Sequence, residues 1–376
     1  MAEISTCTFP IVAVSLCPVD QGKTSARLGK KRLFWIGAGI AAVILHLLLQ
    51  QYPVIAEYGY GNTIYPVIRF CFTYTLGLLP IAGIDLVASG ALVLLYFTGI
   101  RPVIRRTWSL ASFVVGLLST AGALIFLFQI LWGFNYGRDG LDVRLGFPMT
   151  GLSREALEAE YVRATHELED ALAACDPDVL GMRTARAHER SVIPAMRQVI
   201  AEAGYHVTAT PRVRVVRPKG ILMRWNTAGI YLPFSGEGHV DAGMLPVQIP
   251  FTLAHEMAHG FGVTDEGDCN FLAYLACRNA ADPAVRFAGV LTYWRYAASA
   301  YRRVFPEAFN SRYDQLPAVV RRILAEIHAN DARYPDLFPK LRNAVYDSYL
   351  KTQGVHEGLL SYNRVVELAV AYHHGR

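Results

Sequence analysis

The chain carries little charge and lacks the cysteine pattern of a disulfide-stabilised protein. Charged residues make up 18% of its 376 residues, against about 25% in typical soluble domains. Its six cysteines include no Cys-x-x-Cys pair and no regular framework. The net charge of +5 is scattered or lies beside apolar runs, so no basic face for nucleic acid is expected. These absences exclude a small disulfide scaffold and a nucleic-acid-binding protein.

What the chain has instead is long apolar runs, concentrated before residue 137. Hydrophobic residues account for 53% of the sequence, and the runs lie at about 33–51, 77–100 and 108–134. A helix needs ~20 apolar residues to cross a bilayer. We therefore expect a cytoplasmic tail over residues 1–32, a region of three transmembrane helices over 33–136, and the lipid bilayer as a partner.

Two features of this region have alternative interpretations. Asp85 interrupts the second run, and an acid in lipid is costly unless it faces protein or water. It has either a functional role or a role in holding the spans together. The segment 52–76 is rich in aromatic residues and glycine. It is either an interfacial or re-entrant helix from about residue 64, or a plain loop.

The lysine and arginine bias predicts the orientation of the spans. Basic residues cluster at 23–32 and again at 101–106, after two crossings, and such clusters favour the cytoplasmic side. The third span then places everything after Tyr136 outside the cytoplasmic membrane of a bacterium. Trp132, Phe134 and Tyr136 are expected to form an aromatic belt at that outer interface. The long basic region before the first run favours a retained anchor over a cleaved signal peptide.

Residues 137–376 have the composition of a soluble domain, which we expect to be mostly α in an α+β arrangement. Short β-like runs at 212–216, 221–225 and 229–233 indicate a small sheet. Residues 229–234 are the candidate edge strand for holding an extended peptide, since Pro233 is tolerated at an edge; a purely structural strand is the alternative. Helical patterns occupy the rest, at 153–174, 183–203, 247–262, 265–279, 284–304, 316–330, 337–352 and 361–372.

The most informative motif is His255-Glu-Met-Ala-His259, which reads H-E-x-x-H within an apolar stretch. Residues four apart lie on one face of a helix, so both imidazoles can point at one metal ion. Glu256 projects beside them, placed to take a proton from a zinc-activated water. This is the arrangement of zinc peptidases.

Catalytic zinc usually has three protein ligands, and the third is less obvious. No H-E-x-x-H-x-x-G-x-x-H is present, because the residue six beyond His259 is Asp265. Glu266 and Asp268 follow closely. All three acids also suit the start of a helix, where a carboxylate is favoured without any metal. Spacing alone does not choose between them.

The chain resembles the DUF3810 family, a group of bacterial membrane-anchored proteins, from the first span onward. The resemblance implies a zinc metallopeptidase of the HExxH, gluzincin-like type with a zincin-like domain. It rests on the motif helix and on Tyr65-Pro66, Leu79-Pro80, Gly83-Ile-Asp85, Leu131-Trp-Gly-Phe-Asn-Tyr136, Gly229-Ile-Tyr-Leu-Pro-Phe-Ser-Gly-Glu237, Asn270-Phe-Leu-Ala-Tyr-Leu-Ala-Cys277, Asp347-Ser-Tyr-Leu-Lys351 and Gly358-Leu-Leu-Ser-Tyr362.

The resemblance also selects a third ligand. The family has a glutamate two residues before its Asn-Phe pair, and counting back from Asn270-Phe271 reaches Asp268. Asp268 is therefore the expected third zinc ligand, with Glu266 as the alternate. Aspartate in place of glutamate is a departure, since the shorter side chain requires a backbone shift of about 1 Å or more.

These residues predict a membrane-anchored, zinc-dependent endopeptidase acting on a peptide or protein substrate. Zn²⁺ would be held by His255, His259 and Asp268, with Glu256 as the general base. Tyr362, in a segment that resembles the family, would donate to the oxyanion, unless it is a core tyrosine. Glu237, His239 and Asp241 either line the cleft or form a polar turn. The alternative function is a catalytically inactive peptide-binding or scaffold protein of the cell envelope.

Overall fold

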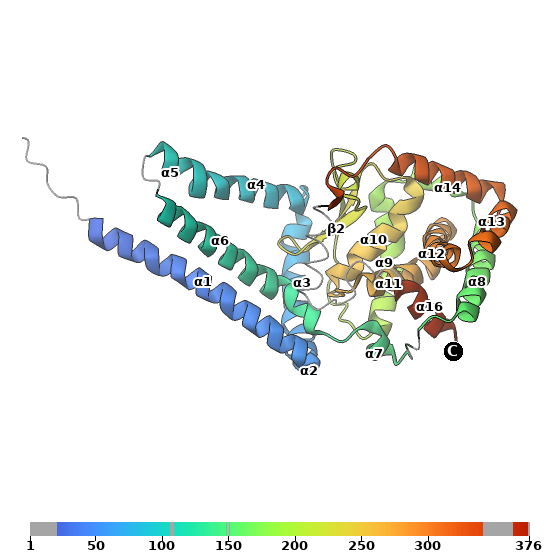
Figure 1. The fold of residues 1–376 in the computed structure, drawn as a ribbon, viewed down its shortest axis with the longest axis horizontal. Helices are drawn as coiled ribbons and strands as arrows, with labels where there is room; N and C mark the ends of the chain where they lie inside the picture. Colours follow the sequence, from blue (N-terminus) through green and yellow to red (C-terminus); the bar gives the residue numbers. More distant parts are fainter. Residues whose placement is uncertain (1–20, 106–108, 148, 150, 341–363, 375–376) are drawn as a thin grey trace, which may run out of the picture.

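The computed structural model describes residues 21–105, 109–147, 149, 151–340 and 364–374. Long apolar helices extend from one side of a mostly helical domain that contains one small sheet (Figure 1). The expected apolar helices, the mostly helical content and the small sheet are therefore present.

Among the described residues, three helices are long and apolar enough to cross a membrane: the Gly29–Gln51 part of α1 (Gln21–Gln51), Gly83–Ile104, and α6 (Leu110–Leu131). The second comprises α4 (Gly83–Leu95), η3 (Tyr96–Ile100) and α5 (Arg101–Ile104). α1 packs along α6 where Gly39 faces the backbone of Gly122, so closely that a side chain at either position would overlap the other helix. Small residues allow such close approach between membrane helices.

The second of these helices begins six residues later than expected, which changes the environment of Asp85. α4 starts at Gly83, so Asp85 lies in its first turn rather than inside the span. A carboxylate is favoured at a helix N-terminus by the helix dipole. Asp85 thus belongs to the start of the apolar helix, where its charge costs far less than in lipid.

The segment between the first two apolar helices is helical and contacts the domain. It consists of α2 (Pro53–Ile55), η1 (Ala56–Gly61), α3 (Ile64–Tyr74) and η2 (Leu76–Leu78). Arg69 of α3 is buried and donates to Gly236 O at 2.6 Å. Of the two alternatives for this segment, the structure has the helix from residue 64, and this helix bridges the apolar helices and the domain (Figure 1).

The sheet has three strands in the order β1-β3-β2. β1 (Val213–Val216) runs parallel to the central β3 (Glu237–Asp241), and β2 (Gly229–Leu232) runs antiparallel to it, with Tyr231 opposite Gly238. The strand expected at 221–225 is absent, because Asp241 accepts hydrogen bonds from Gly220 N and Leu222 N and holds this stretch in a turn. The central strand was missed, since its polar residues resemble a turn.

The domain's core lies around two helices, α10 (Ile249–Gly260) and α11 (Glu266–Arg278), which are buried along most of their length. The expected helices are present, apart from 337–352, most of which lies outside the described residues. The surrounding elements are α7 (Leu141–Leu145), α8 (Arg154–Ala173), η5 (Pro177–Met182), α9 (Ala185–Glu202), η6 (Met223–Trp225), α12 (Pro283–Val304), α13 (Pro306–Gln315), α14 (Ala318–Asp331) and α16 (Arg364–His374).

Candidate metal centre

The two histidines of the motif lie on one face of α10. The helix begins with Pro250 in its first turn, where a proline loses no hydrogen bond, and its apolar residues are buried in the domain. His255 and His259 are one turn apart, and their Nε2 atoms are 3.1 Å from each other. Two nitrogen ligands of a tetrahedral zinc ion, at 2.0–2.1 Å from the metal, would be about 3.3 Å apart. The pair therefore fits a shared ion.

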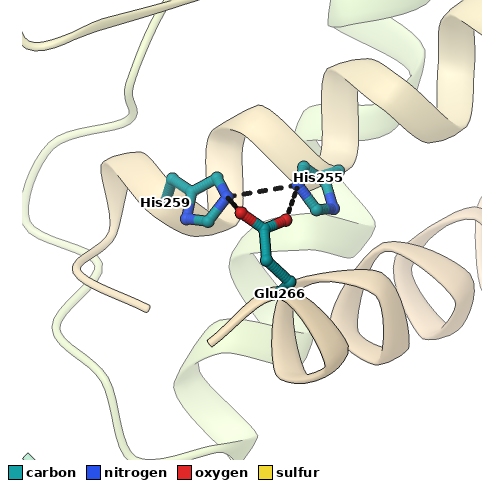
Figure 2. Close-up of side chains that lie close together, drawn as sticks. All are labelled: His255, His259 and Glu266. Atoms are coloured by element: carbon teal, nitrogen blue, oxygen red, sulfur yellow. Dashed lines mark hydrogen bonds and ion pairs between the residues drawn. The ribbon is translucent and has the colours of Figure 1, made fainter. Parts of the chain in front are cut away.

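The third group is Glu266, the first residue of α11. Its Oε2 lies 3.2 Å from His255 Nε2, and its Oε1 lies 3.7 Å from His259 Nε2 (Figure 2). Ligand atoms of the three residues all fall within 4.8 Å of one another. Two imidazoles and a carboxylate are the donor set of many catalytic zinc sites.

The structure does not bring Asp268, the expected third ligand, to the histidines. A helix turns by about 100° per residue, so side chains two apart project in nearly opposite directions. Asp268 points away and accepts hydrogen bonds from Leu141 N at 2.8 Å and Arg364 Nε at 2.9 Å. Glu266, the alternate, therefore replaces Asp268 as the candidate ligand, and no shift of the backbone is needed.

The outer nitrogens of both imidazoles are held by hydrogen-bond acceptors. His255 Nδ1 lies 2.9 Å from Asn270 Oδ1, and His259 Nδ1 lies 3.0 Å from the carbonyl oxygen of Val263. A proton on each Nδ1 leaves both Nε2 lone pairs facing the carboxylate. Lone pairs and a negative charge that converge in this way suit a cation. Orienting contacts of this kind are usual around metal-bound histidines.

The charge state of the cluster is consistent with a cation site. Burial would raise the pKa of Glu266, but hydrogen bonds with His255 and His259 outweigh it and hold that pKa well below its usual value. Burial would lower the pKa of His259, but Cys269 and the Glu266 carboxylate raise it well above its usual value. Glu266 is therefore ionised, and a divalent ion would compete with a proton for His259.

Glu256 is buried between α10 and the sheet. Burial raises its pKa to about 7, although the nearby His255 and His259 act in the opposite direction. Among the described residues, its Oε2 has no hydrogen-bond partner. A Cβ at Gly229 of β2 would overlap the Glu256 carboxylate, and one at Gly238 of β3 would overlap its Cβ. Glycine at both positions is what makes room for this side chain.

The strand beside Glu256 is an edge strand. β2 pairs only with β3 in the part of the chain that the structure describes. Asp241 N donates to Ala228 O, and Ile230 pairs with His239. Backbone groups alternate along an antiparallel strand, so those of Gly229 and Tyr231 point to the open edge. The expected edge strand is thus present, next to the candidate base.

Residues 60–370 match the profile of DUF3810, a family described as proteins of unknown function. The chain belongs to the DUF3810 family. No curated protein and no solved structure matches it.

The remaining residues that were expected at the site of this DUF3810 protein lie elsewhere. Tyr362 is outside the described residues. Glu237 accepts from Arg214 Nε at 2.7 Å and from Gly83 N at 2.8 Å, and His239 Nε2 lies 3.3 Å from Ile84 N. Glu237 and His239 therefore attach the start of α4 to the sheet. Asp241 is occupied by the turn at 220–223, so none of the three lines a cleft beside the histidines.

The aromatic residues after the third apolar helix are also placed differently from the expected belt. Trp132 and Phe134 are each 5% exposed and pack with Tyr60, Tyr65 and Tyr231. They join the apolar helices to the domain instead of facing lipid. In this DUF3810 chain, sequence reasoning also missed Asn270 and Val263 as histidine partners. Asn270 could have been predicted as a histidine partner, because it lies in one of the segments through which the chain resembles the family.

Proposed function

We propose that the protein is a membrane-anchored zinc endopeptidase of the gluzincin-like type. The observation that carries the proposal is the convergence of His255, His259 and Glu266, with both outer imidazole nitrogens already engaged. The donor set and its spacing fit zinc. A zinc ion bound there would lower the pKa of a water molecule toward ~7 and polarise a peptide carbonyl.

Glu256 is the proposed general base. It would accept a proton from the attacking water and return it to the leaving amine. Burial raises its pKa to about 7 in the zinc-free protein, and a zinc ion bound beside it would favour the carboxylate form that a general base requires. Its confinement under Gly229 and Gly238 would hold the carboxylate in place during both transfers.

β2 is the proposed support for the substrate backbone. An extended peptide can add to an open strand edge through main-chain hydrogen bonds. The carbonyl oxygen of Gly229 already accepts a hydrogen bond from Thr227 Oγ1 at 2.7 Å. The N–H of Gly229 and both backbone groups of Tyr231 would therefore align such a peptide beside Glu256. This arrangement favours cleavage within a chain, because it recognises backbone and requires no free terminus.

The proposed location is the bacterial cytoplasmic membrane, with the domain outside. The ends of the apolar helices remote from the domain are those near the basic clusters at 23–32 and 101–106 (Figure 1), which favour the cytoplasm. Met182 is 84% exposed on the domain. In a variant without native cysteines, Met182→Cys should be labelled in intact cells by a membrane-impermeant thiol reagent.

The test of the function combines metal content with hydrolysis. Full-length protein purified in detergent should contain one zinc per chain and cleave members of a peptide library. Glu256→Gln should retain the zinc and lose the cleavage. Protein that binds no zinc would favour the alternative of a non-catalytic peptide-binding or scaffold protein. Cleavage by Glu256→Gln at the parent's rate would exclude the proposed mechanism.

A further inference from the structure

The candidate site is attached to the apolar helices by buried hydrogen bonds. Trp132, the residue directly after α6, donates from Nε1 to the carbonyl oxygen of His259 at 2.8 Å. Tyr65 of α3 donates from its hydroxyl to the carbonyl oxygen of Gly260 at 2.8 Å. Both aromatic side chains are buried. The histidine-bearing end of α10 is therefore held at the end of the third apolar helix.

The sheet is attached to the second apolar helix in a similar way. Glu237 and His239 of β3 are fully buried, and they accept the backbone N–H groups of Gly83 and Ile84 at the start of α4. Glu256 projects from α10 against β3, where Gly238 makes room for its side chain. Each of these elements is thus bonded directly to a different apolar helix, and no flexible linker separates the site from either.

The edge strand β2 lies on the same side of the domain. The Tyr231 ring is 5.6 Å from the Trp132 ring, centroid to centroid. Arg69 of α3 reaches both the Tyr231 hydroxyl at 3.3 Å and Gly236 O at 2.6 Å. Figure 1 shows β2 at the face of the domain from which the apolar helices extend. A peptide lying along β2 would therefore run close to the bilayer surface.

The height of the site above the hydrocarbon follows from these contacts. A bilayer is ~30 Å thick in its hydrocarbon core and ~40–45 Å with its headgroups, which leaves ~5–8 Å of headgroup on each side. The backbone of His259 is one indole side chain and one hydrogen bond from Trp132, the first residue beyond α6. With the hydrocarbon boundary placed at the end of α6, the candidate zinc ligands lie at or just above the headgroup layer.

We infer that the substrates are membrane-anchored proteins, cut in an extended segment directly next to their own membrane span. The inference rests on the peptidase function proposed above. A chain that leaves the bilayer passes the height of β2 within its first few residues. A cleavage site further along a rigid substrate chain lies farther from the bilayer than β2. The buried hydrogen bonds to the apolar helices prevent the domain from moving outward to reach that site.

The test uses full-length, zinc-loaded protein in proteoliposomes together with single-span reporter proteins. A randomised segment directly after the reporter span first identifies a sequence that is cut. That sequence is then moved outward by twelve prolines or by twelve Gly/Ser residues. Twelve prolines form a stiff spacer of about 37 Å. Twelve Gly/Ser residues span only ~20 Å on average and can bend back to the surface.

The proline spacer should lower the initial rate of reporter cleavage about tenfold or more. The Gly/Ser spacer, which has the same number of residues, should keep most of that rate. Protein carrying Glu256→Gln in the same vesicles measures any background cleavage. Equal rates for the direct and the proline-spaced reporters would overturn the inference and leave the peptidase function standing. If no anchored segment and no soluble library peptide is cut by zinc-loaded protein, the proposed function is wrong, and the inference falls with it.

Discussion

Glu266 and Asp268 point to opposite sides of the first turn of α11. The Glu266 carboxylate lies between His255 and His259, while Asp268 forms an ion pair with Arg364 at 2.9 Å. The two acids therefore have separate tasks. Glu266 faces the candidate metal, and Asp268 ties the start of α11 to α16.

This difference gives a matched pair of variants. Glu266→Gln should lower zinc affinity by more than about 100-fold, since changes in outer-shell residues alone cost 10–100-fold. Asp268→Asn should keep the affinity within about tenfold of the parent. Competition with a chelating dye on detergent-purified protein measures both. Loss of zinc from Asp268→Asn together with its retention by Glu266→Gln would restore Asp268 as the ligand.

The close packing of Gly229 against Glu256 predicts a loss of activity without a loss of metal. Gly229→Ala places a methyl group where the Glu256 carboxylate lies, so the base must move. Displacements of about 1 Å can cost 100-fold in rate; kcat should fall by about tenfold or more, with zinc content unchanged. Gly181→Ala is the control, because a Cβ there meets nothing within 4 Å. Full activity of Gly229→Ala would argue against Glu256 as the base.

The raised pKa of Glu256 predicts how the stability of the zinc-free protein depends on pH. Burial raises the pKa of this carboxyl to about 7 in the folded state, so between the ordinary glutamate pKa and 7 the folded protein binds more protons than the unfolded chain. Stability should therefore fall as pH rises through that window, by about 3 kcal/mol from this group.

Thermal unfolding of zinc-stripped protein between pH 5 and pH 8 measures this effect. Glu256→Gln removes the titrating group at nearly constant shape, so its unfolding temperature should decline less over the same range. Parallel curves for the parent and Glu256→Gln would show that Glu256 titrates normally.

Removal of the hydrogen bond from Trp132 to the carbonyl oxygen of His259 should lower the stability of the folded protein modestly. Trp132→Phe keeps an aromatic ring and loses the N–H donor; the carbonyl oxygen of His259 retains a bond from Gly262 N. The expected loss of stability is about 1 kcal/mol, seen as a lower unfolding temperature. Trp225→Phe is the matched control, because Trp225 is 44% exposed and should change stability by no more than about 0.5 kcal/mol. Equal effects of the two changes would mean that this bond does not stabilise the site.

Features encoded within a few turns of the chain were predictable. The apolar runs identified all three long apolar helices, with end points off by a few residues, because hydrophobicity alone marks them. The motif placed His255, Glu256 and His259 on one helix, since its spacing matches the helical repeat. The edge strand at residues 229–232 was also expected. β3 was not, because its buried polar residues are stabilised by partners from the start of α4 and from β1.

The sequence by itself determined a pair of histidines with a neighbouring glutamate, behind helices able to cross a membrane. Both properties depend only on residues close together in the chain. The tertiary structure decided that Glu266, not Asp268, completes the cluster, because that depends on the direction in which α11 leaves the loop after α10. It also decided how near the site lies to the ends of the apolar helices, since the contacts of Trp132 and Tyr65 with α10 join segments that are far apart in the sequence.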